Sequence, residues 1–542
     1  MPHAAFYGDF RILLCLSYLF FTSFSFSSGG SDWEMGIIGC GILYFFARFI
    51  LTFFPRLNQI FYLLLLFWGI SEVIYGQLQL LGITPSNNGL YYLTGSFSNP
   101  GPFSGFLATL FPLTLCAIRN KSTNLKIEKL HQWIGWIGLF CFLSLLPVGM
   151  SRAAWLATII GGSIVLIQWF PWKFSLRKQI ERNQKRFWWS MIGLWVMIFA
   201  IGIGIYLLKK DSADGRLLIW KVSTHLIAEQ PWVGIGGGQF AGAYGKAQAT
   251  YFANGTATPQ EERVAGSPEY SFNEFLQITV EHGLLGLGLF LFVLINAFQQ
   301  AWRNKQIGLV GSLSALLTFS CFSYPFHVPQ LLALLALFLG LAHGPTSTPS
   351  YHKANSLVLI GTTWILLLIA FIGQYNQWQV RQEALQKWQE ERIYYNIQIY
   401  EGTVDCYRKI YPILQTNPHF LFEFGQCLSK TGAYQESNQI LQEGLQYSSD
   451  PMFWNILGKN YQALGQYSEA ENCFLQAHHL IPHRLYPLYL LAKLYFSTNQ
   501  ITKGIAMAQK VVTHSPKIAS STIEDMKIEM KKKLKEYKKN EL

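Results

Sequence analysis

The chain has 542 residues, of which 51% are hydrophobic and 16% aromatic, and only 13% carry a charge. Soluble domains carry about 25% charged residues, so this composition excludes an ordinary soluble protein and indicates a polytopic membrane protein. The formal net charge of +12 does not require nucleic acid as a partner, because much of the excess lies in short runs between apolar segments and in the C-terminal tail.

The first 375 residues are dominated by apolar runs, and a spanning helix needs about 20 such residues. The N-terminus lacks a small-residue cleavage site, so it is interpreted as the first spanning helix and not as a removed signal. In chain order the apolar runs predict about eleven spanning helices, at residues 10–28, 35–54, 58–80, 103–119, 132–149, 152–170, 190–208, 283–302, 306–324, 328–343 and 354–373.

Basic loops set the expected orientation. Residues 119–131 and the segment WKFSLRKQIERNQKRF are rich in lysine and arginine, so both are expected in the cytoplasm. The N-terminus is then cytoplasmic, and residues 81–102, the long loop 209–282 and everything after 373 lie outside. In a bacterial inner membrane, outside means the periplasm.

Two short outer segments contain candidate ligand-binding residues. Asn99 precedes Pro100 and Gly101 at the start of a predicted helix, where a structural turn is the simpler interpretation. Arg152 lies at the outer end of another helix, in a turn where the positive-inside rule disfavours a cation. It is either a snorkelling anchor or a phosphate ligand.

The long loop opens with an amphipathic helix that ends before Pro231,. Arg216 lies in its first turn, where a cation opposes the helix dipole, so it is placed there for another reason. The run GIGGG, which includes Gly236, could expose N–H groups to an anion or simply form a tight turn. Arg263, in EERVAGSPEY, is a further candidate cation.

Residues 270–283, YSFNEFLQITVEHG, place polar side chains directly before an apolar run. Asn273, Glu274, Glu281 and His282 are therefore either the edge of an active site or an interfacial cap and anchor. In the second interpretation, Asn273 or Ser271 caps the helix.

After residue 375 the composition becomes polar and repetitive. GAYQES at 432–437 and GQYSEA at 465–470 are 33 residues apart, and residues 451–482 follow the tetratricopeptide pattern. We therefore expect an α-solenoid over 376–520, serving as a docking surface for a partner or as a packing module. A lysine-rich tail follows at 521–542. The fold class is all-α: a membrane helical bundle with a C-terminal solenoid.

Four segments occur along the chain in this order: FSNPGPFSGFLA, SRAAWLA, DGRLLIW with EQPWVGIGGGQF, and FNEFLQITVEHGLLGLGLF. In these segments and their order, the chain resembles the O-antigen ligase and O-antigen polymerase-like membrane glycosyltransferases. Some members of that family carry tetratricopeptide tails. The resemblance implies a GT-C-like fold. It implies transfer of a glycan from an undecaprenyl-diphosphate carrier to an acceptor outside the membrane, with no metal or nucleotide cofactor.

The resemblance also implies roles for individual residues. Arg216 and Arg152 match family arginines, and arginines can stabilise a departing diphosphate. Many family members have His-Asn where this chain has Phe272 and Asn273, and phenylalanine cannot transfer a proton. That departure leaves Glu274 as the candidate base and Asn273 as a hydrogen-bonding group. The substrate-binding candidates are Arg152, Arg263, Asn99, Gly236 and His282.

The sequence leaves the acceptor open and allows two alternative functions. The acceptor is lipid A core, a growing polysaccharide or a protein, and all three would use the same donor site. A polysaccharide-related transporter is the alternative from another class, but it should place ionisable residues near the bilayer midplane. A membrane-tethered scaffold would leave the outer arginines unexplained.

Overall fold

The structure is a computed structural model that describes residues 31–54, 57–120, 125–169, 189, 204, 209–343, 353–515, 517 and 520–540. All regular elements in these ranges are helices, which confirms the predicted all-α class. The predicted spans at 10–28 and most of 190–208 lie outside the described residues.

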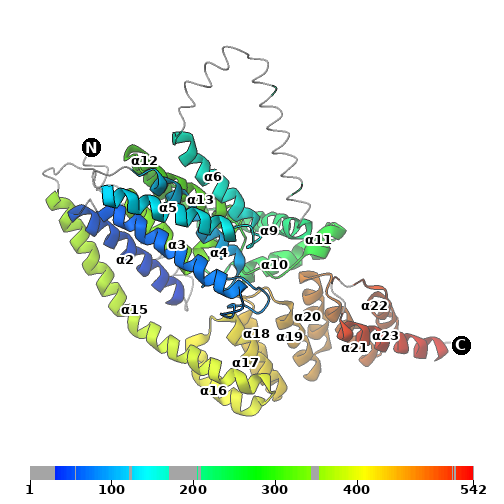
Figure 1. Cartoon of the computed structure of the whole chain (residues 1–542). Helices are drawn as coiled ribbons and strands as arrows, with labels where there is room; N and C mark the ends of the chain where they lie inside the picture. The colour runs from blue at the N-terminus through cyan, green and yellow to red at the C-terminus, as the bar shows by residue number, and fades with distance from the viewer. Residues whose placement is uncertain are drawn as a thin grey trace.

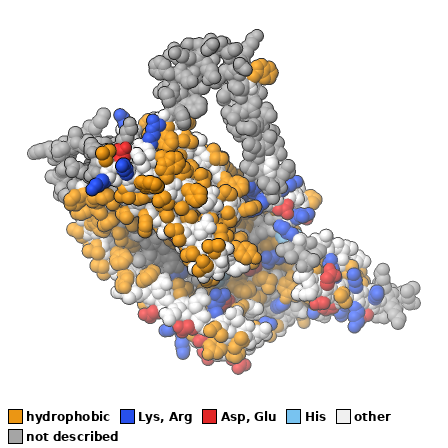
Figure 2. All heavy atoms as spheres, viewed as in Figure 1, with side chains coloured by type: hydrophobic (Ala, Val, Ile, Leu, Met, Phe, Trp, Pro, Cys, Tyr) orange, Lys and Arg blue, Asp and Glu red, His pale blue; other side chains and the backbone are white. Residues whose placement is uncertain are grey.

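The helices of the bundle are α2 (Ser31–Phe53), α3 (Asn58–Leu80), α4 (Pro100–Ile118), α5 (Leu125–Leu145), α6 (Arg152–Trp169), α12 (Glu274–Arg303), α13 (Ile307–Ser320), the short 3₁₀ helix η2 (Pro325–His327) and α14 (Pro329–Ala342). Within the described ranges, α3, α4, α6 and α12 are long and apolar enough to cross a membrane, and Ile38–Leu51, α13 and α14 are shorter apolar helices. Figure 2 shows hydrophobic side chains covering the visible face of this bundle, whereas charged side chains gather on the C-terminal part. The chain is therefore a multi-pass membrane protein.

Helix α4 forms the centre of the bundle and contacts α3, α5, α6, α13 and α14. Its side chains from Pro102 to Leu115 are buried. Close helix approach depends on small residues, as is usual between membrane helices. A Cβ at Gly161 of α6 would lie 2.7 Å from the carbonyl oxygen of Gly311 in α13, so these two helices touch backbone to backbone.

The long outer loop folds into α9 (Lys210–Glu229), α10 (Phe240–Ala253) and α11 (Pro259–Val264). Leu218, Val222 and Leu226 of α9 pack with Phe240 and Tyr244 of α10 in a separate small core. The expected amphipathic helix is thus present, and its apolar face packs against protein.

Helix α15 (Lys353–Asn396) leads from the bundle to the C-terminal repeats without a break (Figure 1). The predicted domain boundary at 375 falls inside this helix, so the two parts are joined by a continuous helix and not by a loop. The repeats are α16 (Tyr400–Leu414), α17 (Pro418–Lys430), α18 (Tyr434–Gly444), α19 (Pro451–Ala463), α20 (Tyr467–Leu480), α21 (Leu485–Ser497) and α22 (Ile501–Thr513).

The lysine-rich tail forms helix α23 (Ser521–Asn540). Met530 is fully buried and packs with Leu485, Leu488 and Val511 of the last repeat. The tail therefore closes the end of the solenoid, as terminal helices of repeat arrays do.

The repeats also pack against the outer loop. A Cβ at Gly242 of α10 would collide with the carbonyl oxygen of Gln446, between α18 and α19. Gln248 of α10 donates a hydrogen bond to the carbonyl oxygen of Leu480 at 2.6 Å, and His419 lies 3.6 Å from Glu269. The solenoid thus holds the segment that leads into residues 270–283.

Candidate active site at the start of α12

The first turn of α12 is fixed by local side-chain hydrogen bonds. The Asn273 Oδ1 atom accepts from the backbone N–H groups of Phe275 at 3.1 Å and Leu276 at 3.2 Å. Asn273 is therefore the N-cap, as its residue type favours, and its amide oxygen is already occupied. This agrees with the capping interpretation. A ligand contact of the Asn273 side chain would then be made by its Nδ2 group.

The residue before the cap has an unusual backbone. Phe272 adopts φ 54°, in the left-handed region that side chains larger than Asn rarely occupy. Ser271 stabilises the turn, since its hydroxyl donates to the Asn273 carbonyl at 2.6 Å and its N–H donates to Gln277 at 2.8 Å. This conformation presents the Phe272 ring to Arg216, which lies 5.2 Å from the ring centroid.

Arg216 and Arg152, from different parts of the chain, are near enough for their charges to interact. Burial lowers the pKa of Arg216, and the positive charge of Arg152 lowers it further, while Tyr324 opposes the shift. The half-buried guanidinium group of Arg216, next to the Phe272 ring and near the charge of Arg152, makes this part of the cluster electropositive,.

Glu274 is buried, with 2% of its surface exposed, and it faces the turn between α13 and α14. Its carboxylate accepts from the N–H of Phe326 at 2.7 Å and lies 3.4 Å from Nδ1 of His327. The Glu274 carboxylate thus contacts a histidine, and the position of this carboxylate is set by contacts within the protein.

His327 was not among the residues that the sequence singled out. Burial lowers its pKa, but the carboxylates of Glu274 and Glu281 outweigh burial, so the net shift is upward. Its side chain keeps 18% of its surface exposed. The sequence could have indicated His327 as a candidate, because the predicted topology places residues 325–327 on the same outer side as residues 270–283.

An aromatic group connects the arginines with this histidine. Tyr324 contacts Phe272 edge-on at 5.5 Å and stacks on Tyr270 at 4.8 Å, and Tyr270 lies 4.4 Å from the His327 ring. Burial, together with nearby carboxylates, raises the pKa of Tyr270 to about 12. Arg216 and His327 are therefore parts of one contiguous cluster.

The glycine run GIGGG has a structural role in this cluster. Helix α12 breaks at Gly283, with φ 67° and ψ −174°, and the exposed carbonyls of Val280 and Glu281 accept from Ile235 at 3.0 Å and Gly236 at 2.9 Å. The Gly236 N–H is therefore occupied, which speaks against the predicted anion contact through that group. The N–H groups of Gly238 and Phe240 instead bond the Glu281 carboxylate.

The remaining predicted residues lie at the edge of the cluster or outside it. Asn99 caps α4 through the Gly101 N–H at 2.9 Å, which is the structural interpretation. His282 is enclosed by protein, with 1% of its surface exposed. The Arg263 side chain is 63% exposed and lies 3.9 Å from Asp211, so it faces solvent at the surface of α9 and α11.

Comparison with known protein families gives two matches. Residues 137–291 match the family model described as O-Antigen ligase, and residues 453–478 match the model described as Tetratricopeptide repeat. No curated protein matches the chain closely enough to count as a relative. The first match contains Arg152, Arg216, Phe272 and Glu274, whereas His327 lies beyond its end. The predicted resemblance is thus confirmed: residues 137–291, in the membrane part, are similar to the O-antigen ligase family, and residues 453–478, in the C-terminal part, are similar to tetratricopeptide repeats.

Proposed function

We propose that this membrane ligase transfers a glycan from an undecaprenyl-diphosphate-linked donor to an acceptor at the periplasmic face of the inner membrane. The observation that carries the proposal is the pairing of half-buried Arg216 with the charge of Arg152, in one cluster with the Glu274–His327 pair.

The two arginines would bind the diphosphate of the donor. As the bond between the sugar C1 and the diphosphate oxygen breaks, negative charge grows on the leaving group, and preorganised cations stabilise that charge. Arginine suits this role because its planar fork meets two phosphate oxygens at once. The diphosphate would also relieve the repulsion between Arg216 and Arg152.

The acceptor hydroxyl would lose its proton to His327 as its oxygen bonds to C1. The Glu274 carboxylate at Nδ1 would orient the imidazole ring and stabilise the imidazolium that forms when the ring takes the proton, as in other carboxylate–histidine pairs,. Glu274 is then a positioning residue for His327 and not the base itself. This revises the expectation from sequence, because the Glu274 carboxylate is engaged by the Phe326 N–H and by His327.

The acceptor distinguishes the alternatives. Lipid A core would make the protein an O-antigen ligase, a growing chain would make it an O-antigen polymerase, and a protein would make it an O-oligosaccharyltransferase. The packing of the repeats on α10 and on Glu269, next to Tyr270, favours a protein partner near the site.

Deletion of the gene, followed by gels of lipopolysaccharide and of periplasmic glycoproteins, tests the proposal. Loss of capped lipopolysaccharide, shortened chains or an unglycosylated protein would each select one acceptor. Unchanged patterns in all three would contradict glycan transfer.

A further inference from the structure

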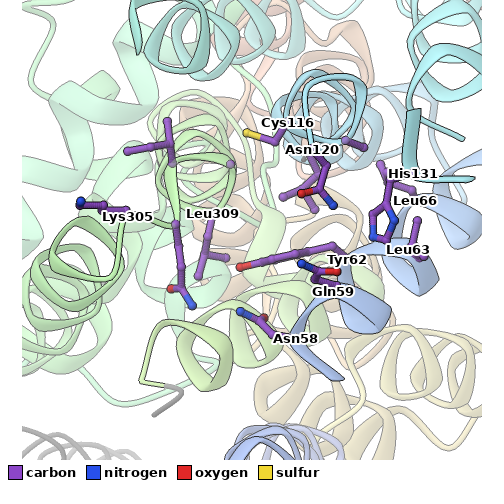
Figure 3. Close-up of a pocket in the computed structure, with 15 residues that line it drawn as sticks. Asn58, Gln59, Tyr62, Leu63, Leu66, Cys116, Asn120, His131, Lys305 and Leu309 are labelled. Carbon is purple, nitrogen blue, oxygen red and sulfur yellow. The ribbon is translucent and has the colours of Figure 1, made fainter. Parts of the chain in front are cut away.

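A cavity with several polar side chains in its lining lies at the other end of the bundle from the candidate active site. It has a volume of about 300 Å³ and is enclosed by the first turns of α3, the end of α4, the start of α5 and the connection from α12 to α13. Figure 3 shows Asn58, Tyr62 and His131 around this space and Lys305 at its edge. The polar residues that line it are Asn58, Gln59, Tyr62, Asn120, His131, Lys305 and Gln306.

This cavity is separate from the candidate active site. Helix α12 connects the two regions, since it is broken at Gly283 near the site and ends at Arg303 beside the cavity. At 1.5 Å per residue this stretch is about 30 Å long, which matches the hydrocarbon thickness of a bilayer. The cavity therefore lies at the opposite membrane face.

The cavity contains buried polar atoms that lack hydrogen-bond partners within the described part of the chain. These atoms are Asn58 Oδ1, Tyr62 Oη, His131 Nε2 and Gln306 Oε1. His131 as a whole is 4% exposed. The Tyr62 hydroxyl lies beside the Asn58 side chain, but outside hydrogen-bonding geometry. Buried polar groups are nearly always bonded, so the cluster requires an occupant.

The chemistry of these atoms defines that occupant. His131 Nδ1 lies 2.8 Å from the Ile127 carbonyl oxygen, so Nδ1 carries the proton and Nε2 of the neutral ring accepts. Gln306 Nε2 donates to the Leu341 carbonyl oxygen at 3.2 Å, which leaves Oε1 facing the cavity. Asn58 Oδ1 also accepts. These three unpartnered atoms are therefore acceptors, and a ligand that satisfies them must donate hydrogen bonds, as a primary ammonium does,.

The surroundings are those of a lipid site. Lys305 is exposed at the edge of the cavity, with its ammonium directed outward (Figure 3). Leu63, Leu66 and Leu309 supply an apolar lining. Further along α3, Leu64 is 59% exposed, so its outer face is open to acyl chains.

We infer that this cavity binds the phosphoethanolamine headgroup of a membrane lipid. The ammonium donates to unpartnered acceptor atoms of the cavity, the phosphate lies near Lys305, and the acyl chains lie along α3. Phosphatidylcholine is the discriminating comparison, because its quaternary ammonium carries no N–H donor.

The test measures the thermal midpoint of the delipidated full-length protein in detergent. Phosphatidylethanolamine should raise the midpoint by a few °C more than phosphatidylcholine of the same chain length does, as expected for a saturated site. The variants Gln306→Leu and Asn58→Leu should each reduce this difference, whatever their own stability. Gln442→Leu, an exposed glutamine in the repeats, should preserve it.

Three outcomes would overturn the inference. Equal midpoints in the two lipids would leave the cavity to water. An unchanged lipid difference in both cavity variants would place the lipid elsewhere. A shift of the same size with soluble O-phosphoethanolamine would make a free small molecule the occupant.

Discussion

Replacement of Arg216 by alanine tests the proposed diphosphate site, with Arg263→Ala as the matched control. Both arginines belong to the outer loop between α6 and α12. Arg216 is half-buried against Phe272 and near the charge of Arg152, whereas Arg263 is 63% exposed and 3.9 Å from Asp211. The two changes remove the same side chain from different surroundings.

The expected loss follows from these surroundings. Removal of one preorganised group that stabilises transition-state charge costs about 3–4 kcal/mol, or about 10²–10³ in kcat. The cation–π contact with Phe272 contributes about 0.5–2 kcal/mol to folding, but its loss is partly offset by relief of the repulsion from Arg152. We therefore expect Arg216→Ala to lose activity while it remains folded. An exposed pair such as Arg263–Asp211 contributes about 0–1 kcal/mol, so the control should change little.

The assay compares purified variants for transfer from a lipid-linked glycan donor, with the thermal midpoint of each as a check on folding. Arg216→Lys separates charge from geometry, since lysine keeps the charge without the fork. It should recover only part of the rate. An Arg216→Ala protein with more than a tenth of the wild-type rate, or an equal loss in Arg263→Ala, would refute the diphosphate assignment.

Further predictions address the base, the helix break and the repeats. Glu274→Gln removes the main charge that raises the pKa of His327, so the acid limb of the pH–rate profile should move to lower pH with activity retained in part; complete loss at every pH would make Glu274 itself the base. Gly283→Ala places a side chain at φ 67° against the backbone of the 231–233 turn, so roughly 2–4 kcal/mol of destabilisation is expected, and a normal thermal midpoint would contradict it. Gly242→Ala should loosen the repeats from α10 and raise hydrogen exchange there, whereas Gly402→Ala, with open space around it, should leave exchange in α10 unchanged.

The elements that were predictable from sequence are those specified by local patterns. Apolar runs indicated the spanning helices, and the 33-residue spacing indicated the repeats. The glycines in the repeats also behave as the pattern requires, since a Cβ at Gly425 would lie 2.6 Å from the Leu441 side chain. Short-range rules of this kind depend on neighbouring residues and need no knowledge of tertiary contacts.

The site was only partly predictable, because its decisive contacts join distant segments. His327 and Glu274 are 53 residues apart in sequence, and their contact depends on how the α13–α14 turn meets α12. In the same way, the Gly236 N–H could have bound an anion in isolation, but the break at Gly283 provides a carbonyl that occupies it. Residue type indicated the chemistry of these groups, and tertiary packing determined their partners.

The central claim is that the protein cleaves a glycan from a polyprenyl diphosphate. The most direct measurement incubates purified protein in lipid vesicles with such a donor and an acceptor, and follows free undecaprenyl diphosphate together with the glycosylated acceptor. We predict that the two products appear in equal amounts and that Arg216→Ala suppresses both. Intact donor that crosses the vesicle bilayer without release of undecaprenyl diphosphate would contradict the account and would identify a transporter.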